Sequence, residues 1–546
     1  MFNRIVHLIV FASVLASLFA AAPAQPAHAA GIIYVNDDAA GANNGTSWTN
    51  AYTDLQSALA AAASGDQIWV AAGTYKPTTT TQRFISFTLK NGVAVYGGFA
   101  GTESSLSERD PAANVTILSG DIGTANDMSD NSYHVVNASS TLNTAVLDGF
   151  TITGGNATGI GSNGNGGGIF ILTSASPALS NLIISNNHAN DKGGGMYNYI
   201  DITPSLTNVT FTGNSAALGG GVYTQDADPT LTNVTFSGNT ASNMGGGMYN
   251  TDGSVPILTN VTFIGNSAAS AGGGMRNIVC DPILINVTFT ENSAAFGGGM
   301  QNLGANPTLT NVTFSGNTAG GAIYNGSSNP TIRNSIMYGN TGGEIVDTNS
   351  SAPVVTYSIV QGGYAGEGNL DADPMLGALA NNGGFTQTMA LSAGSPAIDA
   401  GTNSGCPATD QRGIARPFGI QCDIGAYEVN SATLTLISTD SQDGWILEST
   451  ETSGVGGTKN NTASTLNVGD DAANKQYRAM LSFDTTLPAN AVITGVTLKF
   501  KYAGKSGTLP FSTHGKLLVD VRHVSPFGNN AALQLGDFKS GANKSA

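Results

Sequence analysis

A short segment that recurs at a nearly constant interval constrains this chain more than any other feature. The stretch LTNVTFTGNSAALGGGVY, which begins at Leu206, returns with small changes as LTNVTFSGN, LTNVTFIGN, LINVTFTEN and again LTNVTFSGN. Its leading asparagines are separated by 25, 27, 26 and 25 residues and are Asn208, Asn233, Asn260, Asn286 and Asn311. A unit of this length cannot bury its own apolar face, so it gains a core only by stacking on its neighbours.

Within each copy, apolar and polar residues alternate as they do in a β-strand. Val209 and Phe211 fall on one face of the expected strand and Thr210 on the other. Three short strands, separated by Asn and Gly turns, fill one unit, and each pairs with its equivalent about 4.8 Å away in the next unit. The sequence therefore predicts an all-β fold, in which a small β-sandwich follows a right-handed parallel β-helix.

Polar residues of the repeat also form rows, for which we predict structural roles. The Asn208 row lies at a turn, where stacked side-chain amides hydrogen-bond along the helix. A second row closes the F-x-x-N element, and we expect it to adopt the left-handed turn conformation; it contains Asn214, Asn239, Asn266, Asn292 and Asn317. Triple glycines, which begin at Gly193, Gly219, Gly245, Gly272 and Gly297, form corners where backbones approach closely.

The pairing of an F-x-x-N element with a Gly-Gly-apolar element resembles the repeat of chlamydial polymorphic outer-membrane proteins. More broadly, it resembles the pectin-lyase-like β-helix proteins, and we expect the β-helix to span 31–370. Upstream, the stretch DLQSALAAAASGDQIWVAAGTY from Asp54 is similar to the capping helix and first coil of that superfamily. A polar residue followed by an Ala/Leu run predicts a short helix that closes the open apolar end.

The N-terminus predicts export. Within residues 1–30, Arg4 precedes an apolar run, and Ala27-His28-Ala29 forms a small-residue cleavage site, as in a secretory signal peptide. No later stretch has the roughly 20 apolar residues that a membrane span needs. The net charge of −16 predicts that nucleic acid is repelled. We expect a secreted or cell-surface protein whose partner is an extracellular polysaccharide or a cell-surface glycan.

Two further segments follow the coils. Residues 371–430 resemble the choice-of-anchor Q domain, which we expect to close the helix, and residues 434–546 resemble the DNRLRE-type sandwich, a group that includes carbohydrate-binding modules. The chain ends without a finishing strand, so we expect a truncated sandwich. In an oxidising compartment, Cys406 and Cys422 are expected to form a disulfide, which leaves Cys280 as an unpaired residue in a loop.

One row of residues suggests a binding surface. The residue after the inward Met, Val or Ile of each glycine-led strand points outward, and these residues are Phe170, Tyr197, Tyr223, Tyr249, Arg276, Gln301 and Tyr324. Exposed rings about 4.8 Å apart would present their faces to sugars. The other interpretation, which we favour, is that the rings stack on one another and stabilise the sheet.

A catalytic alternative rests on Arg276 with Asp226 and Asp252. The lyases that this fold resembles bind calcium through clustered carboxylates and use a basic residue to remove a proton, and oxygen ligands suit Ca2+. Turn chemistry explains most of the acids nearby, because Asp228 and Asp281 precede proline. The same holds for Asp399, Asp410 and Asp423, for which we expect turn and cap roles.

The preferred function is therefore polysaccharide binding or adhesion without catalysis. The alternative is a polysaccharide lyase or glycoside hydrolase that acts on an acidic polysaccharide. Near-identical coils present the same surface many times, whereas a catalytic site needs a local departure from the repeat. The clearest departure is the coil that contains Arg276, Cys280 and Asp281, so we expect any site to lie there.

Overall fold

The computed structural model describes residues 30–430 and 443–481, with short stretches at 438, 483, 498, 503–504, 520–521 and 544–545. The chain divides into two units, 1–430 and 431–546, which we describe separately. Residues 1–29 of the predicted signal peptide and most of the predicted sandwich lie outside the described residues.

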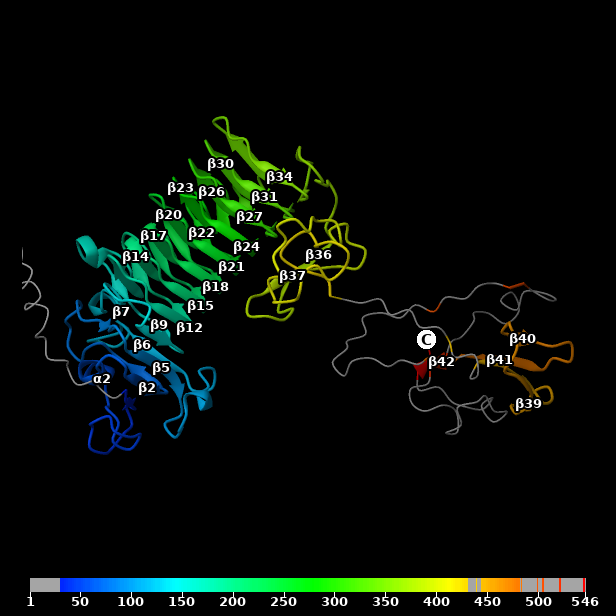
Figure 1. The fold of residues 1–546 in the computed structure, drawn as a ribbon, viewed down its shortest axis with the longest axis horizontal. Helices are drawn as coiled ribbons and strands as arrows, with labels where there is room; N and C mark the ends of the chain where they lie inside the picture. Colours follow the sequence, from blue (N-terminus) through cyan, green and yellow to red (C-terminus); the bar gives the residue numbers. More distant parts are fainter. Residues whose placement is uncertain are drawn as a thin grey trace, which may run out of the picture. The chain divides into compact units, whose positions relative to one another are not determined.

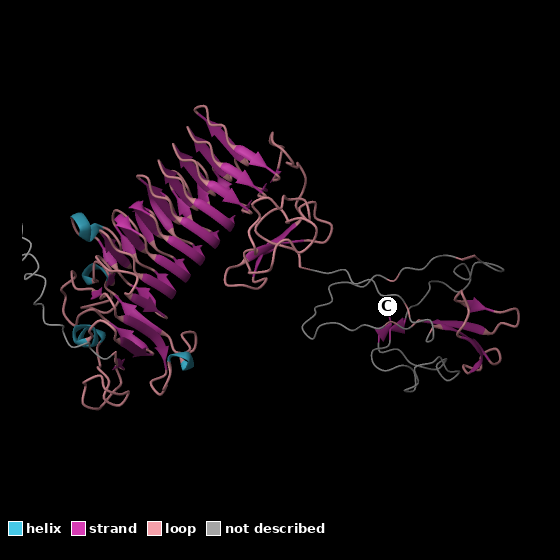
Figure 2. Cartoon of the chain, viewed as in Figure 1, coloured by secondary structure: helices cyan, strands magenta, loops and turns pink. Residues whose placement is uncertain are grey.

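The first unit is a parallel β-helix, as the repeat predicts (Figure 1). Strands of successive coils lie in register, so that Val209 is opposite Val234 and Tyr197 is opposite Tyr223. The strands of the coils form three parallel sheets, which we call sheets A, B and C, and the middle coils contribute to all three (Figure 2).

Sheet A is the largest of the three. Its 18 strands in the described residues are β1 (Ile32–Val35), β2 (Gln67–Ala71), β3 (Gly73–Tyr75), β5 (Ala94–Phe99), β6 (Thr116–Ser119), β8 (Val146–Asp148), β9 (Thr151–Thr153), β12 (Ala178–Ser185), β15 (Ser205–Thr212), β18 (Thr230–Ser237), β21 (Ile257–Ile264), β24 (Ile283–Thr290), β27 (Thr308–Thr310), β28 (Thr313–Ser315), β31 (Thr331–Arg333), β32 (Ile336–Tyr338), β34 (Val354–Thr356) and β35 (Ile359–Val360).

Sheets B and C complete the coils. The described strands of sheet B are β4 (Phe87–Thr88), β7 (Val136–Asn137), β11 (Ile169–Leu172), β14 (Met196–Ile202), β17 (Val222–Ala227), β20 (Met248–Thr251), β23 (Met275–Ile278), β26 (Met300–Leu303), β30 (Ile323–Gly326) and β33 (Ile345–Thr348). Those of sheet C are β10 (Asn156–Ala157), β13 (His188–Ala189), β16 (Ser215–Leu218), β19 (Thr240–Met244), β22 (Ser267–Ala268), β25 (Ser293–Ala294) and β29 (Thr318–Ala319).

The core is built from identical side chains stacked along the axis. The inward phenylalanines of sheet A stack face to face with ring centroids 4.6 to 5.0 Å apart, and they are Phe211, Phe236, Phe263, Phe289 and Phe314. All five are fully buried. Because these five coils present the same ring at the same position, each of them extends a continuous apolar column.

The left-handed backbone occurs in the outer asparagine row and not in the second row, where it was predicted. The outer row hydrogen-bonds along the stack as expected, for example from Asn233 Nδ2 to Asn208 Oδ1 at 3.1 Å. However, this outer row has the left-handed backbone, with φ of 57° at Asn208. The second row forms a buried ladder inside the helix, and the left-handed residue there is the one before it, such as Gly213 with φ of 63°. The prediction of a left-handed second row is therefore wrong.

The triple glycines form corners, as predicted. Gly219 has φ of 64°, which favours glycine. At Gly220 a Cβ atom would lie 2.5 Å from the Thr240 carbonyl oxygen and 2.6 Å from that of Gly246, so a side chain there would collide with the next coil.

A short helix covers the N-terminal end of the stack. Helix α2 (Leu55–Ala61) begins at Asp54, whose side chain accepts a hydrogen bond from the Ser57 amide at 2.7 Å. Leu55, Ala58 and Leu59 are buried in the same core as the coils, which confirms the predicted cap. The described 3-10 helices are η1 (Leu106–Glu108), η2 (Met128–Asp130) and η3 (Gly161–Gly164).

Residues 371–430 lie along the outer face of sheet A at its last coils (Figure 1). The segment contains one antiparallel pair, β36 (Leu376–Ala380) and β37 (Thr388–Leu391). Leu391, Ala397 and Ile424 from this segment pack on Ile336 and Ile359, which point outward from the coils. The expectation that the segment closes the helix is therefore corrected, because it covers the flank of several coils.

The described part of the second unit is a small antiparallel sheet. Its strands β38 (Gly444–Glu448), β39 (Gly456–Asn460), β40 (Gly469–Asp470) and β41 (Gln476–Met480) pair in the order β39-β38-β41-β40. A further antiparallel pair joins β42 (Asp520–Val521) and β43 (Lys544–Ser545). The unit is all β in these stretches, and the resemblance of 434–546 to a carbohydrate-binding module stays a prediction.

Candidate functional site

The aromatic row of sheet B is a buried stack. Phe170, Tyr197, Tyr223 and Tyr249 are each at most 7% exposed, and successive ring centroids lie 5.7, 5.6 and 5.1 Å apart. The faces of the middle rings are covered by their neighbours, and burial raises the pKa of Tyr223 above its usual value. The predicted exposure is therefore corrected for these four residues, and their contacts are those of the stacking interpretation. Tyr324 is half-buried and meets Phe296 edge to face at 5.3 Å.

Arg276 interrupts the stack. It lies in register between Tyr249 and Gln301 and is 6% exposed. Its Nε atom has no hydrogen-bond partner in the described part of the chain, and no carboxylate lies within 4 Å of its guanidinium there. Desolvation lowers the pKa of Arg276. A guanidinium buried without an anion is costly, so this residue departs from the repeat energetically as well as in sequence.

The structure does not assemble the predicted catalytic group. Asp226 at the end of β17 and Asp252 in the turn after β20 are exposed, with left-handed backbones at φ of 50° and 55°. Asp252 accepts a hydrogen bond from Gln225 Nε2 at 2.7 Å, and neither acid forms an ion pair with Arg276. Among the described residues there is no group of three His, Cys, Asp or Glu side chains that would hold a metal ion.

The acids before proline form a structural row. Asp228 accepts from the Val255 amide and Asp281 from the Asn306 amide, both at 2.6 Å, so each turn is tied to the next coil. Cys280 is buried in the same turn region, and desolvation raises its pKa to about 12. This keeps the thiol protonated and unreactive, and Cys280 is unpaired as predicted.

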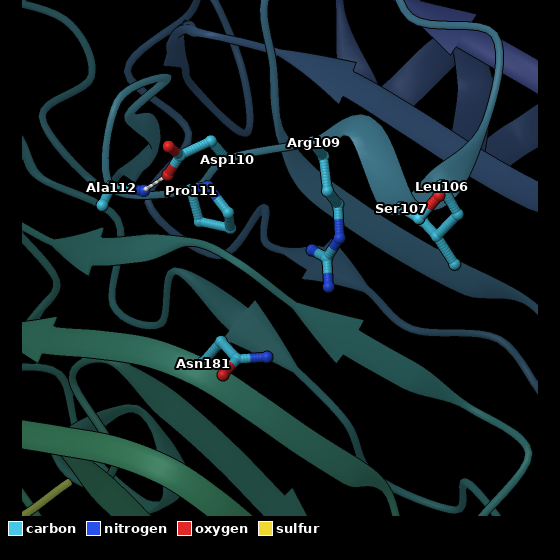
Figure 3. Close-up of a pocket in the computed structure, with 7 residues that line it drawn as sticks. All are labelled: Leu106, Ser107, Arg109, Asp110, Pro111, Ala112 and Asn181. Carbon is cyan, nitrogen blue, oxygen red and sulfur yellow. Dashed lines mark hydrogen bonds between the residues drawn. The ribbon is translucent and has the colours of Figure 1, made fainter. Parts of the chain in front are cut away.

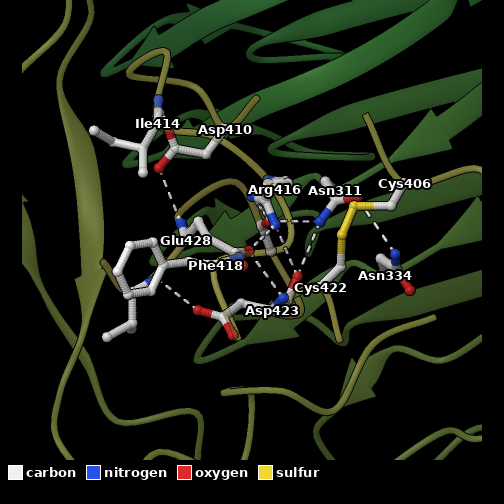
Figure 4. A network of polar contacts seen from close by, with 12 residues as sticks. Asn311, Asn334, Cys406, Asp410, Ile414, Arg416, Phe418, Cys422, Asp423 and Glu428 are labelled. Atoms are coloured by element: carbon white, nitrogen blue, oxygen red, sulfur yellow. Dashed lines mark hydrogen bonds and ion pairs between the residues drawn. A yellow bond between two sulfur atoms is a disulfide. The ribbon is translucent and has the colours of Figure 1, made fainter. Parts of the chain in front are cut away.

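The 371–430 segment is held together by a buried polar network (Figure 4). Arg416 and Glu428 pair at 2.8 Å, Arg412 and Asp410 pair at 2.7 Å, and the predicted Cys406–Cys422 disulfide is present. Asp423 accepts hydrogen bonds from two backbone amides, and Asp410 likewise accepts from the amides of its own turn. The predicted turn and cap roles of these acids agree with the contacts.

The outer face of sheet A carries columns of small polar side chains. One column contains the outward threonines Thr210, Thr235, Thr262, Thr288 and Thr313. Beside it lies the outer asparagine row, in which each Nδ2 donates to the Oδ1 of the preceding coil at 3.1 to 3.2 Å from Asn208 to Asn286. A carboxamide nitrogen has two hydrogens, so each ladder residue retains a second donor.

The docked segment uses these groups. Asn286 Nδ2 donates to its ladder neighbour and also to the Thr409 carbonyl at 2.8 Å. Thr288 Oγ1 donates to Gln411 Oε1, and Gln411 Nε2 donates to Thr262 Oγ1, both at 2.7 Å. At these coils the face therefore offers hydroxyl and amide groups that hydrogen-bond to a polypeptide.

The same groups are uncovered in the preceding coils. Asn208, Asn233, Thr210 and Thr235 are half-buried, and no second partner for the two amides lies in the described residues. Ile183, in the same column one coil earlier, is 48% exposed. We call this surface, formed by the outward residues of β12, β15 and β18, the open face.

A cavity adjoins the N-terminal end of the open face (Figure 3). It has a volume of about 780 Å3 and is lined by Asn181 and by residues 106–107 and 109–112 of the loop between β5 and β6. Arg109 of this loop pairs with Asp148 at 2.6 Å, and Asp148 also accepts from Ser180 Oγ and Asn181 Nδ2. The outer asparagine row thus ends at Asp148, whose charge is compensated by Arg109 beside the cavity.

The sequence contained a signal for this surface. The outward Thr of the V-T-F element becomes isoleucine at Ile336 and Ile359, where the docked segment supplies an apolar contact. Outward threonine by itself does not mark a binding surface, because any solvated strand carries it.

The fold and these ladders define a parallel β-helix protein. A model of the Chlamydia polymorphic membrane protein (Chlamydia_PMP) repeat matches residues 208–225, which confirms the predicted likeness of the repeat. No curated protein matches the sequence. No helix in the described residues is both long and apolar enough to span a bilayer.

Two solved structures are similar to the chain. One is the crystal structure of pectate lyase Pel9A, with a TM-score of 0.45 and 15% identity over 74% of this chain and 97% of that one. The other is a rhamnogalacturonan lyase, with a TM-score of 0.32 and 11% identity over 67% of this chain and 96% of that one.

Proposed function

We propose that this protein is a secreted or cell-surface β-helix that binds extracellular polysaccharide on the open face of sheet A, without catalysis. The observation that carries the proposal is that hydroxyl and amide groups equivalent to those that hydrogen-bond to the 371–430 segment are uncovered on β15 and β18, beside the exposed Ile183 of β12. Sugars are recognised by such groups, because their hydroxyls both donate and accept hydrogen bonds.

The catalytic alternative is not part of this proposal. A lyase needs a base and a charge-stabilising group at one place, whereas Arg276 lies in the sheet B stack and forms no ion pair with Asp226 or Asp252. Calcium is also left out, because the described residues contain no cluster of acids to bind it.

The test is a polysaccharide pull-down and glycan array with the exported chain, alongside ultraviolet detection of unsaturated sugar products. We expect binding without product, and we expect the Thr210→Lys/Thr235→Lys double variant to lose at least tenfold in affinity, because two long cations would obstruct the face. Thr240→Lys, at an exposed position of sheet C, is the matched control. Unchanged binding by the double variant, or product formation, would contradict the proposal.

A further inference from the structure

We propose that the open face takes a neutral linear glycan that lies along the helix axis, with one sugar unit over each coil. This inference rests on the proposed function and names the class of its ligand and the way in which it is bound. It depends on the spacing of the donors, on the charge of the face and on the contrast with the covered coils.

The donors recur with the period of the coils. Asn208 and Asn233 each donate one Nδ2 hydrogen to the Oδ1 atom of the asparagine in the preceding coil, with an N–O distance of 3.1 Å in both cases. The second Nδ2 hydrogen has no partner among the described residues. The docked segment shows what that hydrogen can do, because Asn286 Nδ2 reaches both its ladder partner and the Thr409 carbonyl. Equivalent atoms of adjacent coils are about 4.8 Å apart, and a sugar unit in an extended β-linked glycan advances by a similar distance.

Hydroxyl groups lie beside these amides at the same period. Thr210 and Thr235 are in register in neighbouring strands and are half-buried. A threonine hydroxyl both donates and accepts, so it matches a sugar hydroxyl whichever way that group points. Ile183, 48% exposed in the preceding coil, supplies an apolar contact for the C–H face of a ring.

The charge of the face selects against an anionic ligand. The outward positions of β12, β15 and β18 carry Ser, Asn, Ile and Thr but no lysine or arginine. The cation nearest the ladder's end, Arg109, is already paired with Asp148 at 2.6 Å. Since the whole chain has a net charge of −16, a polyanion would approach an acidic molecule without meeting an unpaired cation on this face.

The covered coils favour a glycan over a polypeptide as the occupant. The 371–430 segment docks over Thr262, Thr288 and Thr313. Beyond them the outward column changes from threonine to Ile336 and Ile359, and Leu391 and Ile424 of the segment pack on these two residues. Protein interfaces rely on such an apolar centre. The open face keeps threonine at these positions and has only Ile183 as a large exposed apolar side chain within its three strands.

The experiment measures the affinity of the exported chain for neutral β-linked oligosaccharides of increasing length and for the same oligosaccharides carrying carboxylate groups, by calorimetry at low and high salt. We expect the neutral series to bind with a Kd that is insensitive to salt and that stops improving at about three to four units. Thr210→Val/Thr235→Val keeps the shape of the face and should weaken binding about tenfold. Thr240→Val on sheet C should change nothing.

The outcomes separate the two proposals. Stronger, salt-sensitive binding of the carboxylated series would overturn the neutral-ligand inference while polysaccharide binding itself stood. Neutral binding that the Thr210→Val/Thr235→Val variant leaves unchanged would overturn the placement on the open face. If neither series binds, the proposed function fails together with the inference.

Discussion

At the scale of single residues, the aromatic row of sheet B contains one residue, Arg276, whose burial is energetically unfavourable. Tyr197, Tyr223 and Tyr249 stack on one another in sheet B with centroids 5.1 to 5.6 Å apart. Arg276 follows in the same column but brings a charge into a site that is 6% exposed, without an ion pair. Stacked rings stabilise a sheet, whereas a guanidinium that is buried without an anion, with the neutral Tyr249 hydroxyl as its polar partner, opposes folding.

Arg276→Tyr is expected to raise stability. The new ring would extend the stack from Tyr249 and remove an uncompensated charge, which should add about 1 kcal/mol to the free energy of unfolding. Thermal unfolding checks this as a higher Tm, with Arg276→Ala as the control that removes the charge without supplying a ring. A lower Tm for the tyrosine variant would contradict this, because the interaction of the guanidinium with Tyr249 would then outweigh the cost of burying its charge.

At the scale of elements, the asparagine ladders connect one coil to the next. Asn239 in the inner ladder is fully buried and donates to Asn266 Oδ1 and to the Phe211 carbonyl, both at 2.9 Å. Its own Oδ1 accepts from the backbone and the side chain of Asn214 at 3.1 and 3.0 Å. One side chain therefore satisfies polar groups of three coils that water cannot reach.

Asn239→Ala should destabilise the β-helix strongly. The change leaves buried donors and acceptors in neighbouring coils unpaired, at a cost of about 1 to 3 kcal/mol for each group. Urea unfolding followed by circular dichroism measures the loss. Thr240→Ala, one residue further on and exposed, is the control and should change stability by less than about 0.5 kcal/mol. Equal effects from both variants would contradict the role of the ladder.

At the scale of the whole first unit, the 371–430 segment and the coils share one interface. Gln411 bridges Thr262 and Thr288, and Asn311 Nδ2 donates to the carbonyls of Asp423 and Gly425 at 3.0 Å. The side chains of the network inside the segment are buried. Burial raises the pKa of Asp423 to about 6, while hydrogen bonds from the Val429 and Asp399 amides lower it in smaller measure.

The docking of this segment is therefore expected to tighten on mild acidification. The raised pKa of Asp423 means that the folded state binds a proton between about pH 4 and pH 6 that the unfolded carboxylate, with a pKa of about 3.9, does not bind. Its contribution to stability rises as the pH falls through this window and is lost again above about pH 6. Amide exchange of residues 399–429 at pH 7 and pH 5, corrected for intrinsic rates, measures the change. Faster corrected exchange at pH 5 would contradict the assignment.

How far the sequence could predict the structure differs between the coils and their surface. The period of the repeat and the alternation around Val209 and Phe211 determined the parallel β-helix, because only stacking can bury such a unit. Asp54 with its Ala/Leu run determined the cap, since a polar residue before an apolar helix is a local signal. These features depend on short-range patterns that recur, and a single chain displays them directly.

Only the tertiary structure decided which outward residues meet solvent. The pattern that placed Tyr223 outward was correct for the strand, yet its neighbours along the axis cover it to 3% exposure. In the same way, Thr210 and Thr288 occupy equivalent positions, and the second is buried because a segment more than a hundred residues away docks on it. Exposure depends on contacts between distant parts of the chain, and the alternation of one strand carries no information about them.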